Sequence, residues 1–392
     1  MLFYSIYRFI RFVLCPVGPF VIGELTIDGN AEIVRTEICE EFIQYAVTDR
    51  IDSFVLGLLM FAIKNGYDFT SELPITDELK YNLEAHLISP LCNTNQNFHR
   101  TCIDAPVISP VKRMAETVAT GISCGIDSLY TIQQHTKETL PSSRRINSLA
   151  FFNVGSSMKG GRILRTPLVE GRLRLARNFA KDYGFGFLFI ESNLHLIINK
   201  YAPYSHLEYH TYMALFCLNT ISPCLKAYYY SSGYPYNKFT MLLDEKGILD
   251  CAHYDLLLMF CASVGEMKLY STGSDKSRIE KTCALLDYEP AQKYLNVCVN
   301  EVKNDGICFK CIRTIMTIDA LGGIDKFSKV FNVDAYKQNR FFYLKRLFLD
   351  AKFRNDEYYN ELLPYFRNEL TLFLKLRFFS SALFNHLKTI FK

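Results

Sequence analysis

The chain of 392 residues is long enough for two or three domains of ordinary size. Hydrophobic residues make up 49% of it, aromatic residues 14% and charged residues 21%, which excludes a disordered, collagen-like or low-complexity protein. The net charge of +4 is too small for the chain as a whole to act as a nucleic-acid binder, so any basic function must be confined to one segment.

Cysteine usage and the apolar N-terminal stretch both bear on location. Thirteen cysteines, an odd number in a long apolar-rich chain, favour reduced, buried or metal-binding thiols over disulfides, and hence a cytoplasmic protein. Residues 1–23 are apolar, but two arginines and two prolines, at positions 8, 11, 16 and 19, interrupt them. A signal peptide or membrane helix needs an unbroken apolar run. We therefore expect buried strands or a helix here, and no membrane span in any later window.

The first part of the chain has a mixed pattern. Residues 20–27 predict a strand, and residues 51–65 have the apolar spacing of a helix. We therefore expect residues 1–112 to form a small N-terminal α+β domain.

Apolar runs then alternate with helical stretches, a pattern typical of β-α-β units on a parallel sheet. In chain order we expect strands at residues 117–122, 146–154, 186–191, 226–230 and 268–271, and helices at residues 127–135, 168–183, 209–219 and 278–286. The sequence thus predicts an α/β domain with a parallel, doubly wound sheet over residues 113–290. A cysteine-containing helical region is expected over residues 291–392.

The C-terminal tail concentrates the basic charge of the chain. Residues 337–392 hold eleven basic and five acidic side chains, together with many aromatic ones. Basic and aromatic side chains together can bind nucleic acid or an anionic surface. Helices that bury aromatic residues and turn lysine and arginine outward give the same pattern. We favour packing, so nucleic acid is the less favoured partner of the tail.

One short segment between a predicted strand and a predicted helix is a candidate binding site for an anion. It comprises the six residues Ser123, Cys124, Gly125, Ile126, Asp127 and Ser128. Small residues after a strand leave backbone N–H groups unpaired, and the next helix adds its own N-terminal donors, which together make an anion site. Gly125 lets the backbone approach a phosphate closely. An acidic residue beside a polyphosphate indicates a divalent cation between them, which would give Asp127 a role in holding magnesium.

The hexapeptide resembles the PP-loop of the N-type ATP pyrophosphatases, whose usual form is Ser-Gly-Gly-any-Asp-Ser. Five of the six positions match, and Cys124 stands where the family has its first glycine. The family includes asparagine synthetases, GMP synthetase, tRNA thiolases and 7-cyano-7-deazaguanine synthase, and its fold is of the adenine nucleotide alpha hydrolase-like (HUP-like) type. The resemblance implies that Ser123, Gly125 and Ser128 contact the phosphates of ATP, and that Asp127 acts through magnesium.

Further polar residues follow the predicted strands. Asn153 ends one of them, and Ser231, Ser232 and Gly233 follow another. Ligands of doubly wound sheets lie over the carboxyl ends of the strands, so we expect these residues to converge on the nucleotide with the loop. Later in the chain, a Ser-Arg-any-any-Lys helix similar to those of related proteins would supply Arg278 and Lys281 to the polyphosphate. A solvated helix face is the alternative for these two cations.

A second cluster contains Cys298, Cys308 and Cys311. The C-x-x-C pair suits one tetrahedral zinc ion, which needs four ligands. The segment from residue 295 to residue 314 resembles a run in PP-loop proteins related to 7-cyano-7-deazaguanine synthase, in which Asp305 takes the place of a cysteine. Zinc would then have Asp305 or Cys283 as its fourth ligand. A packed cysteine knuckle without metal and a thiol or sulfur-carrier role stay open as alternatives.

The resemblance covers residues 54–331 and implies an ATP-dependent enzyme that forms AMP and pyrophosphate. We expect a ligase or amidotransferase that adenylates a carboxylate or amide oxygen of a small molecule or peptide. One alternative is a nucleotide-binding accessory protein that has lost turnover, and another is a tRNA-thiolating enzyme that uses the basic tail. The expected partners are ATP, an unidentified substrate, and a protein partner or a second copy of the chain. The pair His206 and His210, at i, i+4 spacing, we interpret as a packed or surface pair and not a metal site.

Overall fold

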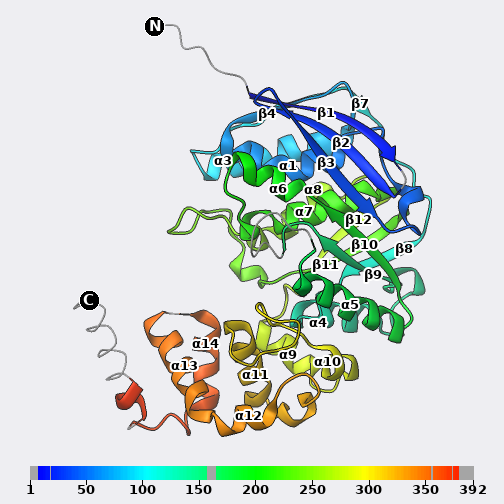
Figure 1. Cartoon of the computed structure of the whole chain (residues 1–392). Coiled ribbons are helices and arrows are strands. Elements are labelled where there is room, and N and C mark those ends of the chain that lie inside the picture. Colours follow the sequence, from blue (N-terminus) through cyan, green and yellow to red (C-terminus); the bar gives the residue numbers. More distant parts are fainter. Residues whose placement is uncertain (1–7, 18, 157–164, 355, 373, 379–392) are drawn as a thin grey trace, which may run out of the picture. The chain divides into compact units, whose positions relative to one another are not determined.

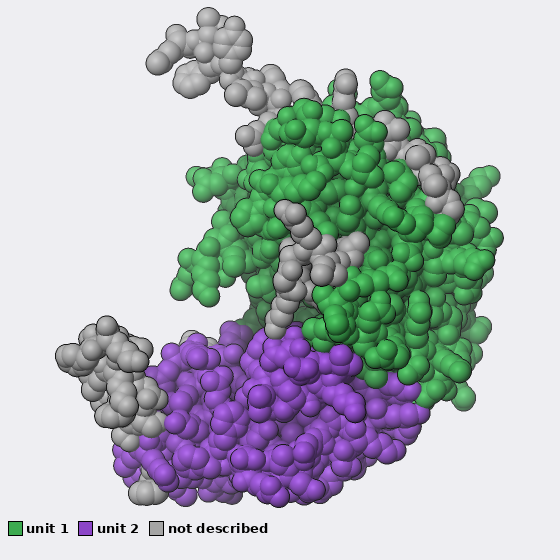
Figure 2. All heavy atoms as spheres, in the orientation of Figure 1, with its two compact units in different colours: residues 1–123, 131–276 green, residues 124–130, 277–392 purple. Residues whose placement is uncertain are grey.

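The structure is a computed structural model that describes residues 8–17, 19–156, 165–354, 356–372 and 374–378 (Figure 1). It divides into two compact units, which Figure 2 colours separately. The first contains the chain up to Ser123 together with Thr131–Lys276, and the second contains Cys124–Tyr130 together with the chain from Ser277 onward. The six-residue loop singled out above is therefore shared, with Ser123 in the first unit and the other five residues in the second.

The first unit is built on one mixed sheet of ten strands. Their order across the sheet is β12-β11-β8-β9-β10-β3-β2-β1-β4-β6. The strands are β1 (Arg8–Val17), β2 (Phe20–Ile27), β3 (Asn30–Ile38), β4 (Tyr67–Thr70), β6 (Ile103–Asp104), β8 (Thr117–Gly121), β9 (Ser148–Asn153), β10 (Gly186–Ser192), β11 (Leu225–Ser231) and β12 (Lys268–Thr272). A separate pair consists of β5 (Ile75–Thr76) and β7 (Val107–Ile108).

Strands β8 to β12 are all parallel to one another. Numbered along the chain from β8, they lie in the order 3-2-1-4-5, so the direction of winding reverses between β8 and β11. This is the arrangement of a doubly wound sheet, whose ligands bind outside the carboxyl ends of the strands at the reversal. The chain is thus a mixed α/β protein with a largely parallel central sheet, and all five strands predicted for residues 113–290 are confirmed.

The N-terminal strands extend the same sheet and do not form one of their own. β1, β2 and β3 are antiparallel neighbours, and β3 pairs antiparallel with β10, where Ile38 lies opposite Ile190. β2 buries every second residue, as a strand with one face on a core does. The expected boundary at residue 112 therefore does not separate two sheets. Sequence periodicity predicts single strands well but not which strand they will join.

The helices of the first unit cover the sheet. They are α1 (Asp52–Asn65), α2 (Asp77–Asn82), the π-helix η2 (Leu83–Ile88), α3 (Ser89–Thr94), α5 (Pro167–Asp182), α6 (Leu194–Tyr201), α7 (His206–Thr220) and α8 (Asp255–Ala262). α1 is buried on all sides and packs on α6 and α7, with Phe54 edge-on to Phe216. α5 packs on β9 and β10, and Figure 1 shows it on the opposite side of the parallel strands from α1 and α7.

The second unit is helical apart from its loops. Its helices are α9 (Arg278–Leu285), α10 (Glu289–Tyr294), α11 (Phe309–Ala320), α12 (Val333–Gln338), α13 (Arg340–Phe353) and α14 (Glu357–Leu362). It also takes in the first turn of α4 (Ile126–His135), which begins inside the six-residue loop. The expected helical region was to start at residue 291, whereas α9 and α10 already belong to this unit.

Two general expectations can be compared with the described residues. Their cysteines, from Cys39 to Cys311, carry no disulfide bonds, in agreement with the prediction of free thiols. Among the described residues, no helix combines the length and the apolar character that crossing a bilayer requires.

Candidate functional site

The loop before α4 makes a tight turn at Cys124. This residue has φ of +58° and is 1% exposed. Its carbonyl oxygen accepts a hydrogen bond of 2.8 Å from the backbone N–H of Asn296, and the Ser128 hydroxyl donates to the carbonyl of Gly125 at 3.1 Å. Burial raises the pKa of the Cys124 thiol to about 12. The thiol is therefore neutral at physiological pH and unsuited to act as a nucleophile.

Asp127, in the first turn of α4, lies between two cations of α9. Arg278 Nη1 is 2.8 Å from Asp127 Oδ2, and Lys281 Nζ is 3.1 Å from Asp127 Oδ1. The two cations are three residues apart and so lie on one face of α9. A capping box formed by Ser277 and Glu280 fixes the start of this helix. All these residues belong to the second unit, so the structure brings together the acidic and basic residues that the sequence singled out.

A third cation, Arg313 on α11, belongs to the same group. Its guanidinium lies 4.0 Å over the ring of Tyr358, and its Nε atom is buried without a hydrogen-bond partner among the described residues. Burial lowers the pKa of Arg313, and the positive charge of Arg278 lowers it further. We had not placed Arg313 in the site from the sequence. The signal was its position two residues after Cys311, within the segment that resembles the family.

Three cations and a carboxylate make up this group. Arg278, Lys281 and Arg313 carry three positive charges, and Asp127 carries one negative charge. Burial acts to raise the pKa of Asp127, but Arg278 and Lys281 outweigh it and lower the pKa, so the carboxylate is ionised. The Lys281 residue is only 1% exposed. Buried charges are costly unless opposite charge lies near them, so three cations gathered on α9 and α11 beside this loop suit an anion.

The other predicted phosphate and nucleotide contacts lie in the first unit, at the carboxyl ends of parallel strands. Asn153 ends β9, and its amide donates a 2.6 Å hydrogen bond to Glu191 at the end of β10. Its side chain is therefore engaged in the sheet edge. Ser231 ends β11, and its hydroxyl is buried without a partner among the described residues. The Ser232 N–H donates to Thr272 of β12, and Gly233 follows in the loop.

The second predicted cluster is brought together in full. The ligand atoms of Cys298, Asp305, Cys308 and Cys311 all lie within 4.8 Å of one another. Cys283, the other residue considered as a fourth ligand, is an exposed thiol of α9 and is not part of this group. Of the two candidates for the fourth position, the structure places Asp305 in the cluster.

Backbone N–H groups hold Asp305 and Cys308 in this cluster. Asp305 Oδ1 accepts from the N–H groups of Ile307 and Cys308, both at 2.9 Å. Although burial acts in the other direction, these bonds lower the pKa of Asp305 to about 2. The N–H of Cys311 donates to Cys308 Sγ at 3.4 Å, so Cys308 caps the N-terminus of α11. Burial raises the pKa of the Cys298 and Cys311 thiols.

In the part of the basic tail that the structure describes, arginines form ion pairs and aromatic side chains are buried. Arg340 forms ion pairs with Asp319 and Glu369, and Asp350 pairs with two further arginines of the tail. Five of the aromatic residues there are buried: Tyr343, Phe348, Tyr359, Phe366 and Phe378. This supports the packing interpretation of residues 337–378, while residues 355, 373 and 379–392 lie outside the described part.

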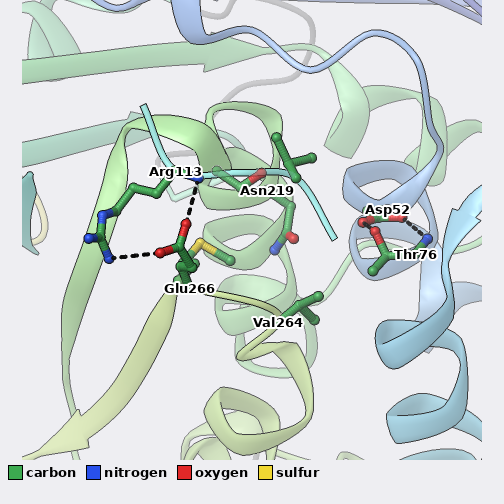
Figure 3. Close-up of a pocket in the computed structure, with 9 residues that line it drawn as sticks. Asp52, Thr76, Arg113, Asn219, Val264 and Glu266 are labelled. Atoms are coloured by element: carbon green, nitrogen blue, oxygen red, sulfur yellow. Dashed lines mark hydrogen bonds and ion pairs between the residues drawn. The ribbon is translucent and has the colours of Figure 1, made fainter. Parts of the chain in front are cut away.

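The enclosed cavity of the first unit shown in Figure 3 has no place in this site. Its volume of about 20 Å³ is room for a single water molecule. It lies beside the buried hydrogen bond from the Thr76 N–H to Asp52 and the ion pair of Arg113 with Glu266.

The second unit thus contains a cationic group around Asp127 and a cluster of three thiols and a carboxylate. The first unit contains polar residues at the ends of its parallel strands. No family model, curated protein or solved structure matches the chain.

Proposed function

We propose that this protein is a PP-loop enzyme of the HUP-like fold that binds ATP and adenylates a carboxylate or amide oxygen, releasing pyrophosphate. The single observation that carries the proposal is that Arg278 and Lys281 both form ion pairs with Asp127, a residue of the loop that resembles the PP-loop. Arg313 lies near enough to Arg278 and Asp127 for their charges to act on it. Pyrophosphate, the product of adenylation, is an anion whose charge this group would balance.

The sheet of the first unit supports the same proposal. Ser123 follows β8, at the point where the winding of the parallel strands reverses. Nucleotides bind at this position in doubly wound sheets. The polar ends of β9 and β11 lie at the same edge, because the carboxyl ends of parallel strands share one edge.

The side chains of the second unit would work chiefly by electrostatics. As the bond between the α- and β-phosphates of ATP breaks, negative charge grows on the departing pyrophosphate, and preorganised cations stabilise it. Arg278 and Lys281 are held ready by Asp127, and Arg313 by the ring of Tyr358. Magnesium, held by Asp127, would supply further positive charge at the phosphates. Arg278 and Lys281 would then exchange Asp127 for phosphate oxygens.

We further propose that Cys298, Asp305, Cys308 and Cys311 hold a structural zinc ion. Three thiols and an ionised carboxylate form a donor set that zinc accepts. Cys308 and Cys311 lie at the N-terminus of α11, and Arg313 follows in the first turns of the same helix. By holding this end of α11, the ion would position Arg313 within the cationic group.

A second candidate function, nucleotide binding without turnover, is favoured by one observation. Cys124 adopts the left-handed conformation that glycine prefers, and its Cβ occupies a loop that must approach phosphates closely. Substitution Cys124→Gly separates the two functions. A large gain in ATP affinity together with pyrophosphate release would indicate a loop that cysteine has impaired, and an unchanged affinity would mean that the loop accommodates cysteine.

The proposal is tested by titrating ATP into the wild type and Asp127→Asn, each with magnesium and with EDTA. Wild type should bind ATP more tightly with magnesium. In Asp127→Asn the cationic group loses the negative charge of Asp127, so metal-free ATP should bind more tightly than it does to wild type, and the gain from magnesium should disappear. A wild type that binds ATP in neither condition would contradict the proposed function.

A further inference from the structure

A second group of metal-ligating side chains lies in the first unit and is independent of the proposed function. It contains His210 of α7 with Asp250 and Cys251, which lie at the start of a short 3-10 turn. Their ligand atoms lie within 4.8 Å of one another, and His210 Nε2 is 3.6 Å from Asp250 Oδ1. Zinc bonds to nitrogen and oxygen of about 2.1 Å give a tetrahedral edge of about 3.4 Å. The histidine and the carboxylate thus already have nearly the separation that a shared ion requires.

Hydrogen bonds around the group orient its donor atoms. His210 Nδ1 is 2.8 Å from the hydroxyl of Tyr230, which is in turn 2.9 Å from the Thr211 hydroxyl. A proton on Nδ1 leaves the lone pair of Nε2 toward Asp250, which is the outer-shell arrangement typical of metal-bound histidines. Tyr230 belongs to β11, so the sheet itself holds the imidazole in place.

The other two ligands are held in the same manner. The backbone N–H of Thr211 donates to Cys251 Sγ at 3.4 Å. Asp250 accepts from the N–H of Ala252 at 3.0 Å through Oδ1 and from the Tyr234 hydroxyl at 3.3 Å through Oδ2. Residues from α7, β11 and the 3-10 turn therefore converge on one point, although they are distant in the sequence.

We propose that His210, Asp250 and Cys251 bind a zinc ion, with one coordination position left for water or for an oxygen or nitrogen of a substrate. Imidazole, carboxylate and thiolate are all ligands of zinc, and three protein ligands with one open position are the usual form of a reactive zinc site. The site has access to solvent, because the side chains of His210 and Asp250 are 22% and 16% exposed.

A thiol nucleophile assisted by histidine is the competing use of these residues. Cys251 is 0% exposed, so a substrate could not reach its sulfur, whereas an ion needs only its lone pair. The site lies by the carboxyl end of β11, on the edge of the parallel sheet where ligands bind. An open coordination position there is suited to hold a polar group of a substrate. From the sequence we had interpreted His206 and His210 as a packed or surface pair, because the glutamate of a metalloprotease motif is missing between them. Asp250 and Cys251, which complete the group with His210, are far away in the sequence.

The test counts zinc in a protein that lacks the other cluster. Cys308→Ser/Cys311→Ser removes two ligands of the second unit and leaves the first unit intact. After equilibration with zinc and gel filtration, this variant should retain about one zinc ion per chain by elemental analysis. Adding His210→Gln should lower the zinc content at least tenfold. Adding His86→Gln, a histidine outside the cluster, should leave the content unchanged, and circular dichroism should show the same helix content in all three.

Two results would overturn the site: a Cys308→Ser/Cys311→Ser variant without zinc, or a zinc content that His210→Gln leaves unchanged. Because His210→Gln could also disturb folding, a second measurement uses cobalt(II) in the same Cys308→Ser/Cys311→Ser background. Charge-transfer absorption from one thiolate to cobalt should appear, and Cys251→Ser should abolish it while leaving the ligand-field bands. Absence of any charge-transfer band would likewise contradict the proposal.

Discussion

At the turn of Cys124, glycine should give a larger free energy of unfolding than alanine, which is the opposite of their usual order. At most positions outside turns, alanine is more favourable than glycine, because glycine has more conformational freedom to lose on folding. At φ of +58° a side chain with a Cβ atom is disfavoured. We therefore expect Cys124→Gly to be more stable than Cys124→Ala.

The magnitude follows from two opposing contributions. The left-handed conformation costs a residue with a Cβ atom about 1–2 kcal/mol relative to the right-handed one. Alanine recovers about 0.4–1 kcal/mol through the lower entropy of its unfolded chain. The difference leaves Cys124→Gly more stable by about 1 kcal/mol. Both variants lose the same buried thiol, so its burial cancels from the comparison.

The free energy of unfolding is best measured by urea denaturation followed by far-ultraviolet circular dichroism, since the chain has no tryptophan. The control compares alanine with glycine at Ala335, a helical residue of α12 in the same unit. There the wild-type protein, which has alanine, should be more stable than Ala335→Gly. A Cys124→Ala variant as stable as Cys124→Gly, or more stable, would refute the reasoning.

Two further predictions concern the anion site and the cysteine cluster. Pyrophosphate with magnesium should raise the melting temperature of the wild type measured by calorimetry, since a ligand at a hundred times its Kd stabilises a protein by about 2.7 kcal/mol. Lys281→Met removes one cation but keeps the length of the side chain, so it should reduce this shift. Equal shifts in the two proteins would contradict the assignment of Lys281 to the anion site. In EDTA, Asp305, whose folded pKa is lowered to about 2, should stabilise the protein above the unfolded pKa of about 4. That contribution should be lost as the pH falls from about 4 toward 2, so Asp305→Asn should flatten this part of the stability profile, and parallel profiles would contradict the assigned hydrogen bonds.

Local features of the sequence were sufficient to predict most elements of the fold. The five parallel strands between residues 113 and 290 and the helices α4, α5, α7 and α9 were predicted, because parallel strands are short apolar runs and such helices have a 3.6-residue period. The short helices α6 and α8 were not predicted. The pairing of β3 with β10 was not, because it joins segments about 150 residues apart and depends on which edge of the sheet remains open. Residues 1–112 were therefore expected to form a separate domain.

Site residues that lie close together in the sequence could likewise be predicted, and those that lie far apart could not. Cys308 and Cys311 were recognisable from their spacing, and Asp127 from its loop, because ligands close in the sequence leave a pattern. Arg313 became part of the anion site only through the packing of α11 beside α9. His210 and Cys251 are separated by a strand and a long loop, so no spacing could have indicated that they meet.

The proposal that this protein binds ATP through its cationic group is best tested by comparing the ATP affinity of wild type and Arg313→Gln in the presence of magnesium. Arg313 was placed in the site by the structure and has a buried Nε without a partner among the described residues, so an anion should be what completes its hydrogen bonds. The matched control is Arg354→Gln, an exposed arginine of the same unit that pairs with Asp350. Arg313→Gln should weaken ATP binding at least tenfold, while Arg354→Gln should leave it unchanged. Equal affinities of wild type and Arg313→Gln would contradict the proposal.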